Sequence, residues 1–404
     1  MLIDAAALRQ DFPALRQPVA DRRRIYLDSA YTSYMPSTVQ KVLDNHHRQS
    51  RRAFYRLDPA HSHSLQVARG TVGSFIGASA EEVVFMRNGT EAINLVAGAW
   101  GRVNLRRGDL IVVSRLEHHS NLTPWQLLTR EVGAELAFIE LLPDGSLDLC
   151  SLDRHLATGR VKLVATAHIS NVLGTLTPVA EITRRAHAMG SVVLLDAAQS
   201  VPHVPVDVRA LDVDFVAFTA HKMLGPTGIG VLYGKRSVLE MMPPFLASGS
   251  VADQVGYRES IWKKPPARFE PWAPPSADAE ALAAAVRYLQ GVGMEAVAEH
   301  GRTLVRYALH ELAQIDGLTI YGPRERGPIV AFTLEGISPS KVAALLGRQG
   351  IVIRAGLHNA QPLHQYLSLA ATARVSFYLY NAEHEIDTLA DALVTLVAKA
   401  AGRK

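Results

Sequence analysis

One lysine stands at the end of an apolar run, where a charged side chain is costly to bury. The stretch 214–230 reads DFVAFTAHKMLGPTGIG, so an expected strand ends near Thr219, and His221 and Lys222 precede a Gly- and Pro-rich turn. Burial disfavours an ammonium ion and lowers its pKa, and the neutral amine can then form a Schiff base. Because most lysines after a strand are solvated loop residues, this interpretation depends on the other motifs of the chain.

Polar motifs follow three further strand-like runs. In open α/β sheets, ligands bind beyond the carboxyl ends of the strands. A single loop histidine or aspartate is more often a cap or turn residue, but a succession of them predicts one polar site at this edge of the sheet. The motifs are Glu117–Asn121 (EHHSN), His168–Asn171 (HISN) and Asp196–Gln199 (DAAQ).

A fifth motif, Arg87–Glu91 (RNGTE), lies between a short strand and a helix. Its small residues leave backbone N–H groups free at the start of the helix, which suits a phosphate group. The alternative is that Thr90 simply caps the helix.

A lysine, a carboxylate and a phosphate site together fit pyridoxal 5′-phosphate (PLP). This cofactor needs a lysine for its aldehyde and an acid beside its pyridine nitrogen, so that the protonated ring can accept electrons from the substrate. A metal site is the competing interpretation. Its candidate ligands are His118, His119, His168 and His221. A metal site is disfavoured because these histidines have no cysteine partners and form no compact H-x-x-x-H pair.

Short apolar strands alternate with helical segments between residues 80 and 235, which predicts an α/β fold with a mostly parallel sheet covered on both faces. The expected strands are 83–86, 110–114, 136–140, 162–166, 192–195, 215–218 and 230–233. A second region contains helices and strands (319–321, 329–334, 351–354 and 374–380) of a smaller α+β domain. We therefore expect an N-terminal segment (1–24) that packs on the small domain, a large cofactor-binding domain (25–290) and a small C-terminal domain (291–404).

The composition excludes several classes of protein. With 404 residues, 48% hydrophobic and 20% charged, the chain is typical of a globular protein. The net charge is +4, but the arginines form short, separated clusters. This pattern differs from the continuous basic stripe of a nucleic-acid-binding protein and argues against that class. The single cysteine, Cys150, excludes an intrachain disulfide and fits a reducing cytoplasm. No stretch predicts a secretory signal or a membrane helix.

Taken together, the motifs resemble those of class V aminotransferase-fold PLP enzymes, and most closely group II cysteine desulfurases and selenocysteine lyases. The resemblance extends from Ile25 to Asn381 and is specific in the combination of EHHSN, HISNVLGT, DAAQS, TAHKMLGPTGIGVLY and Arg374 before SFYLYN. It implies PLP-dependent transferase fold type I, a mostly parallel large-domain sheet, an amino-acid substrate and a homodimer.

The resemblance also implies roles for individual residues. Lys222 is the implied Schiff-base lysine, Asp196 pairs with the pyridinium nitrogen, and His119 stacks on the ring. Gln199 contacts the phenolic oxygen, and Arg374 binds the substrate α-carboxylate. The phosphate is assigned to Thr90, Thr219 and His221, and the remaining cofactor and substrate contacts to Gly89, Asn171, Tyr31, Arg354, His358 and Asn359.

Asn359 is the main departure from the family pattern. Desulfurases of this group carry a cysteine at this place, and it accepts the substrate sulfur as a persulfide. An amide forms no thiolate, and Cys150 lies in what reads as a surface connection. Smaller departures are Gly89 and Ala273, where the family has threonines, together with Leu357 and Tyr31.

These observations predict a PLP-dependent lyase that cleaves the Cβ–S bond of an S-substituted cysteine by α,β-elimination without an enzyme persulfide. Transamination, epimerisation and decarboxylative deamination would use the same cofactor residues and remain open. A non-catalytic, desulfurase-like scaffold is a further alternative, although it predicts loss of the cofactor residues as well.

Overall fold

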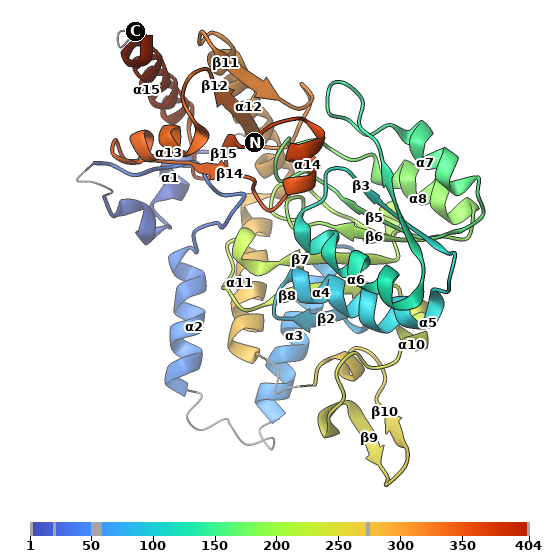
Figure 1. Ribbon diagram of the computed structural model, residues 1–404. Coiled ribbons are helices and arrows are strands. Elements are labelled where there is room, and N and C mark those ends of the chain that lie inside the picture. Colours follow the sequence, from blue (N-terminus) through green and yellow to red (C-terminus); the bar gives the residue numbers. More distant parts are fainter. Residues whose placement is uncertain (1–2, 19–21, 50–58, 272–274, 402–404) are drawn as a thin grey trace.

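The computed structural model describes residues 3–18, 22–49, 59–271 and 275–401 (Figure 1). Within this part, the largest sheet has seven strands in the order β2-β8-β7-β6-β5-β3-β4. Only β8 runs against the others, since it is antiparallel to both of its neighbours. The mostly parallel large-domain sheet expected from the sequence is thus confirmed. The strands are β2 (Val83–Met86), β3 (Leu110–Ser114), β4 (Glu135–Ile139), β5 (Val161–Ala167), β6 (Val192–Asp196), β7 (Phe215–Thr219) and β8 (Gly230–Gly234).

Alternate residues of each strand enter two different cores, which explains the near-continuous apolar sequence. On β3, Ile111 and Val113 join one buried cluster, whereas Val112 joins the cluster on the other face. Helices cover both clusters (Figure 1). They include α2 (Ser37–Gln49), α3 (Pro59–Phe75), α4 (Gly89–Leu95), α5 (Arg102–Asn104), α6 (Thr123–Val132), α7 (Leu149–Leu156), α8 (Val179–Ala188), α9 (Val208–Leu211), α10 (Arg236–Met241) and α11 (Ser276–Val292).

The C-terminal region forms an antiparallel sheet in the order β11-β12-β15-β14. Its strands are β11 (Leu318–Tyr321), β12 (Ile329–Leu334), β14 (Arg354–Gly356) and β15 (Thr372–Ser376), packed with α12 (Met294–Ala313), α13 (Pro339–Gly347), α14 (Gln361–Tyr366) and α15 (Glu383–Ala401). The single strand expected at 351–354 is wrong. It divides into β14 and β13 (Ile351–Val352), because β13 pairs instead with β1 (Ile25–Tyr26) near the N-terminus.

The N-terminal segment reaches the C-terminal helix. Arg9 of α1 (Ala5–Arg9) lies 2.8 Å from Glu385 of α15, and both side chains are buried. The packing of segment 1–24 on a small domain and the domain boundaries stay predictions.

A hairpin of β9 (Ala252–Val255) and β10 (Ser260–Trp262) projects from the body (Figure 1). Ala273 lies outside the described residues.

Two local expectations are wrong. Cys150 does not lie in a connection but in the first turn of α7, where Asp148 caps the helix and the thiol-bearing residue is exposed. Thr90 does not cap α4, because the Asn88 side chain accepts the hydrogen bond from the Glu91 backbone N–H at 2.9 Å. Asparagine is as good a cap as threonine, and it stands one residue before the helix begins.

Candidate active site

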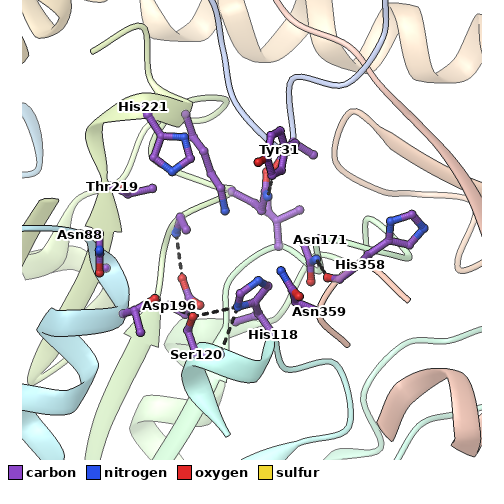
Figure 2. Close-up of a pocket in the computed structure, with 18 of the residues that line it drawn as sticks. Tyr31, Asn88, His118, Ser120, Asn171, Asp196, Thr219, His221, His358 and Asn359 are labelled. Carbon is purple, nitrogen blue, oxygen red and sulfur yellow. Dashed lines mark hydrogen bonds between the residues drawn. The ribbon is translucent and has the colours of Figure 1, made fainter. Parts of the chain in front are cut away.

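The polar motifs meet in one pocket of about 250 Å³ at the carboxyl ends of β3, β5, β6 and β7 (Figure 2). The small domain closes this pocket with residues of β14, β15 and the loop between them. All of the predicted site residues except His119 line it. They are Tyr31, Gly89, Thr90, Asn171, Asp196, Gln199, Thr219, His221, Lys222, Arg354, His358, Asn359 and Arg374.

Lys222 ends a short 3-10 turn (Ala220–Lys222) that follows β7 directly. Burial lowers the pKa of its ammonium group to about 8, and the positive charge of Arg374 acts in the same direction. Asp196 opposes this shift only in part. Lys222 lines the pocket, and a pKa this close to neutral makes the nucleophilic, neutral amine far more accessible than in an exposed lysine.

Asp196 is the last residue of β6 and faces the same pocket. Its Oδ1 accepts a hydrogen bond from the Ala198 backbone N–H at 3.0 Å, which fixes the carboxyl group (Figure 2). Burial raises its pKa, and Lys222 partly offsets this effect. A carboxylate held in this way can stabilise a positive partner in the pocket.

His118, not His119, presents its ring to the pocket (Figure 2). Its Nδ1 accepts from the Ser120 backbone N–H at 3.1 Å, so the proton of the neutral ring sits on Nε2. Burial lowers the pKa of His118 to about 3, with a further contribution from Lys222. His119 instead accepts from the Gln361 backbone N–H and ties the segment after β3 to the loop of Asn359.

One end of the pocket suits a phosphate group. The Thr90 and Ser120 hydroxyls lie 2.7 Å apart, and Thr219 Oγ1 is buried without a partner among the described residues. His221 Nδ1 lies 3.1 Å from Thr32 Oγ1, which orients the imidazole. Gly230 permits β8 to approach the start of α4 closely, because a Cβ on it would lie 2.6 Å from the Cα of Asn88, the N-cap residue of α4.

At the other end, Arg374 is buried and fixed by two acceptors. Its Nη2 donates to Asp28 Oδ1 at 2.7 Å and its Nη1 to the Asn171 carbonyl at 2.9 Å, while its Nε has no partner among the described residues. The Asn171 amide in turn donates to the His358 carbonyl at 2.8 Å (Figure 2). These contacts hold the loop from β14 onto the large domain.

The residues present fit PLP. Gln199 uses its Nε2 to donate to the Ala30 carbonyl at 2.7 Å, which leaves its buried Oε1 unpaired inside the lining of the pocket. Together with the unpaired Thr219 hydroxyl and the Lys222 amine, this oxygen gives the pocket polar groups that need a ligand. No group of three described His, Cys, Asp or Glu side chains is arranged to hold a metal ion.

Sequence reasoning missed four contributors: Asp28, Asn88, His118 and Ser120. Three of them belong to motifs that were singled out, and the order of the two adjacent histidines could not show which ring faces inward. Asp28 lies beside β15 only because residue 28 bridges Ser376 across the domains.

The fold and the pocket define the chain as a PLP-dependent enzyme of fold type I. A solved structure of a C-DES mutant, with glycine covalently linked to the PLP cofactor, has the same fold at a TM-score of 0.82. The two sequences are 21% identical, and the match covers 96% of this chain and 98% of the C-DES chain. The sequence profile of the aminotransferase class-V family matches residues 25–389. The chain belongs to this family.

Within the family, the chain is homologous over its full length to cysteine desulfurases. It is 43% identical to a probable cysteine desulfurase of Halalkalibacterium halodurans, over 97% of both chains. The solved structure of the cysteine desulfurase CsdA of Escherichia coli superposes with a TM-score of 0.91 at 34% identity and covers 100% of this chain and 99% of that one. None of the described helices is long and apolar enough to cross a membrane.

Proposed function

We propose that this chain is a PLP-dependent carbon–sulfur lyase that cleaves the Cβ–S bond of an S-substituted cysteine by α,β-elimination. One observation carries the proposal: the pocket combines the polar groups for the cofactor with no thiol. The only cysteine of the chain, Cys150, is exposed on α7 and does not line the pocket. Asn359 stands where the desulfurase-like pattern places the sulfur-accepting cysteine.

The assigned residues divide between cofactor and substrate. Lys222 would hold the cofactor aldehyde and Asp196 its ring nitrogen. Gln199 would donate to the phenolic oxygen with the second N–H of Nε2, since the first goes to the Ala30 carbonyl. His118 takes the stacking role that the sequence assigned to His119, because its neutral ring lines the pocket. Thr90, Thr219 and His221 would contact the phosphate. When bound, the cofactor supplies an electron-accepting ring that stabilises negative charge at the substrate α-carbon.

The chain's own groups then perform the proton transfers. Arg374 orients the α-carboxylate, with a guanidinium already fixed by Asp28 and Asn171. The Lys222 amine, whose pKa of about 8 lies close to neutral pH, takes the α-proton. The Cβ–S bond breaks with its electron pair on sulfur, so the thiolate leaves without a protein nucleophile.

The test is to incubate the holoenzyme with L-cysteine and S-substituted cysteines and identify the products. Pyruvate, ammonium and the released thiol support the elimination. Alanine without pyruvate would contradict it, as would accumulation of pyridoxamine phosphate alone or a racemised substrate. A colourless protein that does not take up PLP would support the scaffold instead.

We also propose that the chain forms a homodimer and is cytoplasmic. Support for the dimer comes from apolar side chains that are exposed on and near the projecting hairpin, among them Met241, Val255 and Ile261. Light scattering coupled to size-exclusion chromatography measures the mass, and a mass near 43.9 kDa, that of one chain, would contradict the dimer.

A further inference from the structure

The pocket contains two guanidinium groups, although an amino acid offers one α-carboxylate. Arg354 on β14 and Arg374 on β15 are directly opposite partners in the antiparallel pair, and both line the pocket. Asp28 lies 2.7 Å from Arg374 and 4.0 Å from Arg354. Among the described residues, the two cations therefore share a single carboxylate, which leaves one positive charge without a counterion of its own.

The two arginines differ in their surroundings. Arg374 is 3% exposed and fixed on two sides, whereas the Arg354 side chain is 39% exposed at the mouth of the pocket. Arg354 forms no hydrogen bond to a described residue that would occupy its donors; its closest ion-pair distance is the 4.0 Å to Asp28.

Tyr31 determines how Arg354 is presented. The guanidinium carbon lies 3.9 Å from the centre of the Tyr31 ring, and Tyr31 is 50% exposed. Stacking on an aromatic face holds the guanidinium plane while its in-plane N–H groups stay open for a carboxylate. Tyr31 and Arg354 together thus form a prepared anion receptor at the entrance.

We propose that Arg354, held by Tyr31, binds a second carboxylate at the far end of the substrate. The substrate class is then a cysteine thioether whose sulfur substituent ends in a carboxylate. Side chains directly opposite on an antiparallel pair have Cβ atoms about 4.5–5.5 Å apart, a spacing that a Cα–Cβ–S–C chain spans. This inference rests on the proposed elimination for the choice of thioether.

The reaction balances with water as the only co-reactant. Lys222 removes the α-proton, the Cβ–S bond breaks with its electron pair on sulfur, and the carboxylate-bearing thiolate takes a proton. Water hydrolyses the remaining aminoacrylate to pyruvate and ammonium. No oxidant or reductant is needed.

Two substrates of equal size test the receptor: S-carboxymethyl-L-cysteine and its amide, S-carbamoylmethyl-L-cysteine. We compare the acid-to-amide ratio of kcat/KM between the holoenzyme and its variants, so that the different leaving abilities of the two thiols cancel. Arg354→Met is expected to lower this ratio by about tenfold or more, as expected for a lost charge-assisted contact. Tyr31→Ala is expected to lower it less, and Tyr31→Phe, which keeps the ring, to retain it.

Binding provides a second readout that does not depend on turnover. The acid-to-amide ratio of Kd, measured with the holoenzyme from the rapid absorbance change that precedes turnover, should change in the same direction in Arg354→Met. If both ratios are the same in the unchanged enzyme and in Arg354→Met, the receptor is overturned. If neither compound yields pyruvate and ammonium, the proposed elimination fails, while the Kd ratio still decides on the receptor. Should Arg354→Met not fold, Arg354→Lys and Tyr31→Ala give the same comparison.

Discussion

Arg374 donates to Asp28 at 2.7 Å, and both side chains are buried. Asp28 follows β1, which pairs with β13, and Arg374 lies on β15 of the antiparallel C-terminal sheet. The pair therefore fixes the guanidinium before any substrate binds, and leaves its buried Nε as the unpaired donor. A carboxylate that accepts from this Nε needs no rearrangement of the arginine.

We expect Arg374→Lys to lower kcat/KM for any amino-acid substrate by about 100-fold or more, because an ammonium cannot keep both acceptors and still present a planar donor pair. Initial-rate kinetics measures the change. Arg302→Lys, in an exposed pair with Glu299, is the control and should leave the rate unchanged. An Arg374→Lys enzyme with the original kcat/KM would contradict the assigned role.

Asp196→Asn should separate cofactor binding from turnover. The amide retains the size of the side chain but cannot stabilise a protonated ring nitrogen, so kcat should fall by about 100-fold or more. Since Lys222 is intact, the absorbance of bound PLP should persist. Asp391→Asn, on the exposed face of α15, is the matched control. Loss of the cofactor absorbance in Asp196→Asn would assign Asp196 to retention of PLP.

The sequence predicted the buried strands well and the contacts between segments poorly. The apolar runs of β2, β3, β6 and β7 are bounded by polar motifs, so their ends were correct within one residue. The orientation of His118 depends on its bond with Ser120, and the position of Asp28 depends on a bridge to Ser376, 348 residues away in sequence. Neither the periodicity nor the composition of the sequence reveals such contacts, because they depend on tertiary packing.

Lys222→Met should stabilise the apoprotein at pH 7. The folded-state pKa of about 8 lies below the ordinary 10.5, so the folded state bears the burial penalty of the ammonium fully below pH 8. The penalty disappears as the pH rises from 8 to 10.5. Urea unfolding should therefore show Lys222→Met more stable by about 1–3 kcal/mol at pH 7, with a smaller difference at pH 10. An equal difference at both pH values would show that Lys222 is not buried as a charge. Lys341→Met, at an exposed position of α13, is the control.

The buried pair of Arg69 and Glu270 should be essential for the edge of the sheet. Arg69 on α3 lies 2.7 Å from Glu270, which also accepts from the Phe85 backbone N–H on β2 at 2.8 Å. Arg69→Met leaves a buried carboxylate without its partner, and should lower the free energy of unfolding by about 3–5 kcal/mol. Breaking an exposed pair through Arg102→Met should cost at most about 1 kcal/mol. Similar losses in the two variants, measured by urea unfolding, would refute this ranking.

Asn359→Cys tests whether this one position decides the fate of the substrate sulfur. Asn359 lines the pocket and has a left-handed φ of 54°. Asparagine tolerates this backbone conformation, whereas for cysteine it costs about 1 kcal/mol of conformational free energy. Asn359→Ser bears a similar backbone penalty without a thiol and is therefore the matched control.

A cysteine at position 359 could attack the sulfur of L-cysteine and form a persulfide, while the Cβ–S electron pair stays on Cβ and a proton completes alanine. Added dithiothreitol then reduces the persulfide to sulfide. We expect alanine and sulfide from Asn359→Cys in excess of Asn359→Ser, measured by mass spectrometry and a sulfide assay. If both variants release only pyruvate, the thiol alone does not redirect the reaction. Other residues of the pocket then determine whether the Cβ–S electron pair leaves with the sulfur or stays on Cβ.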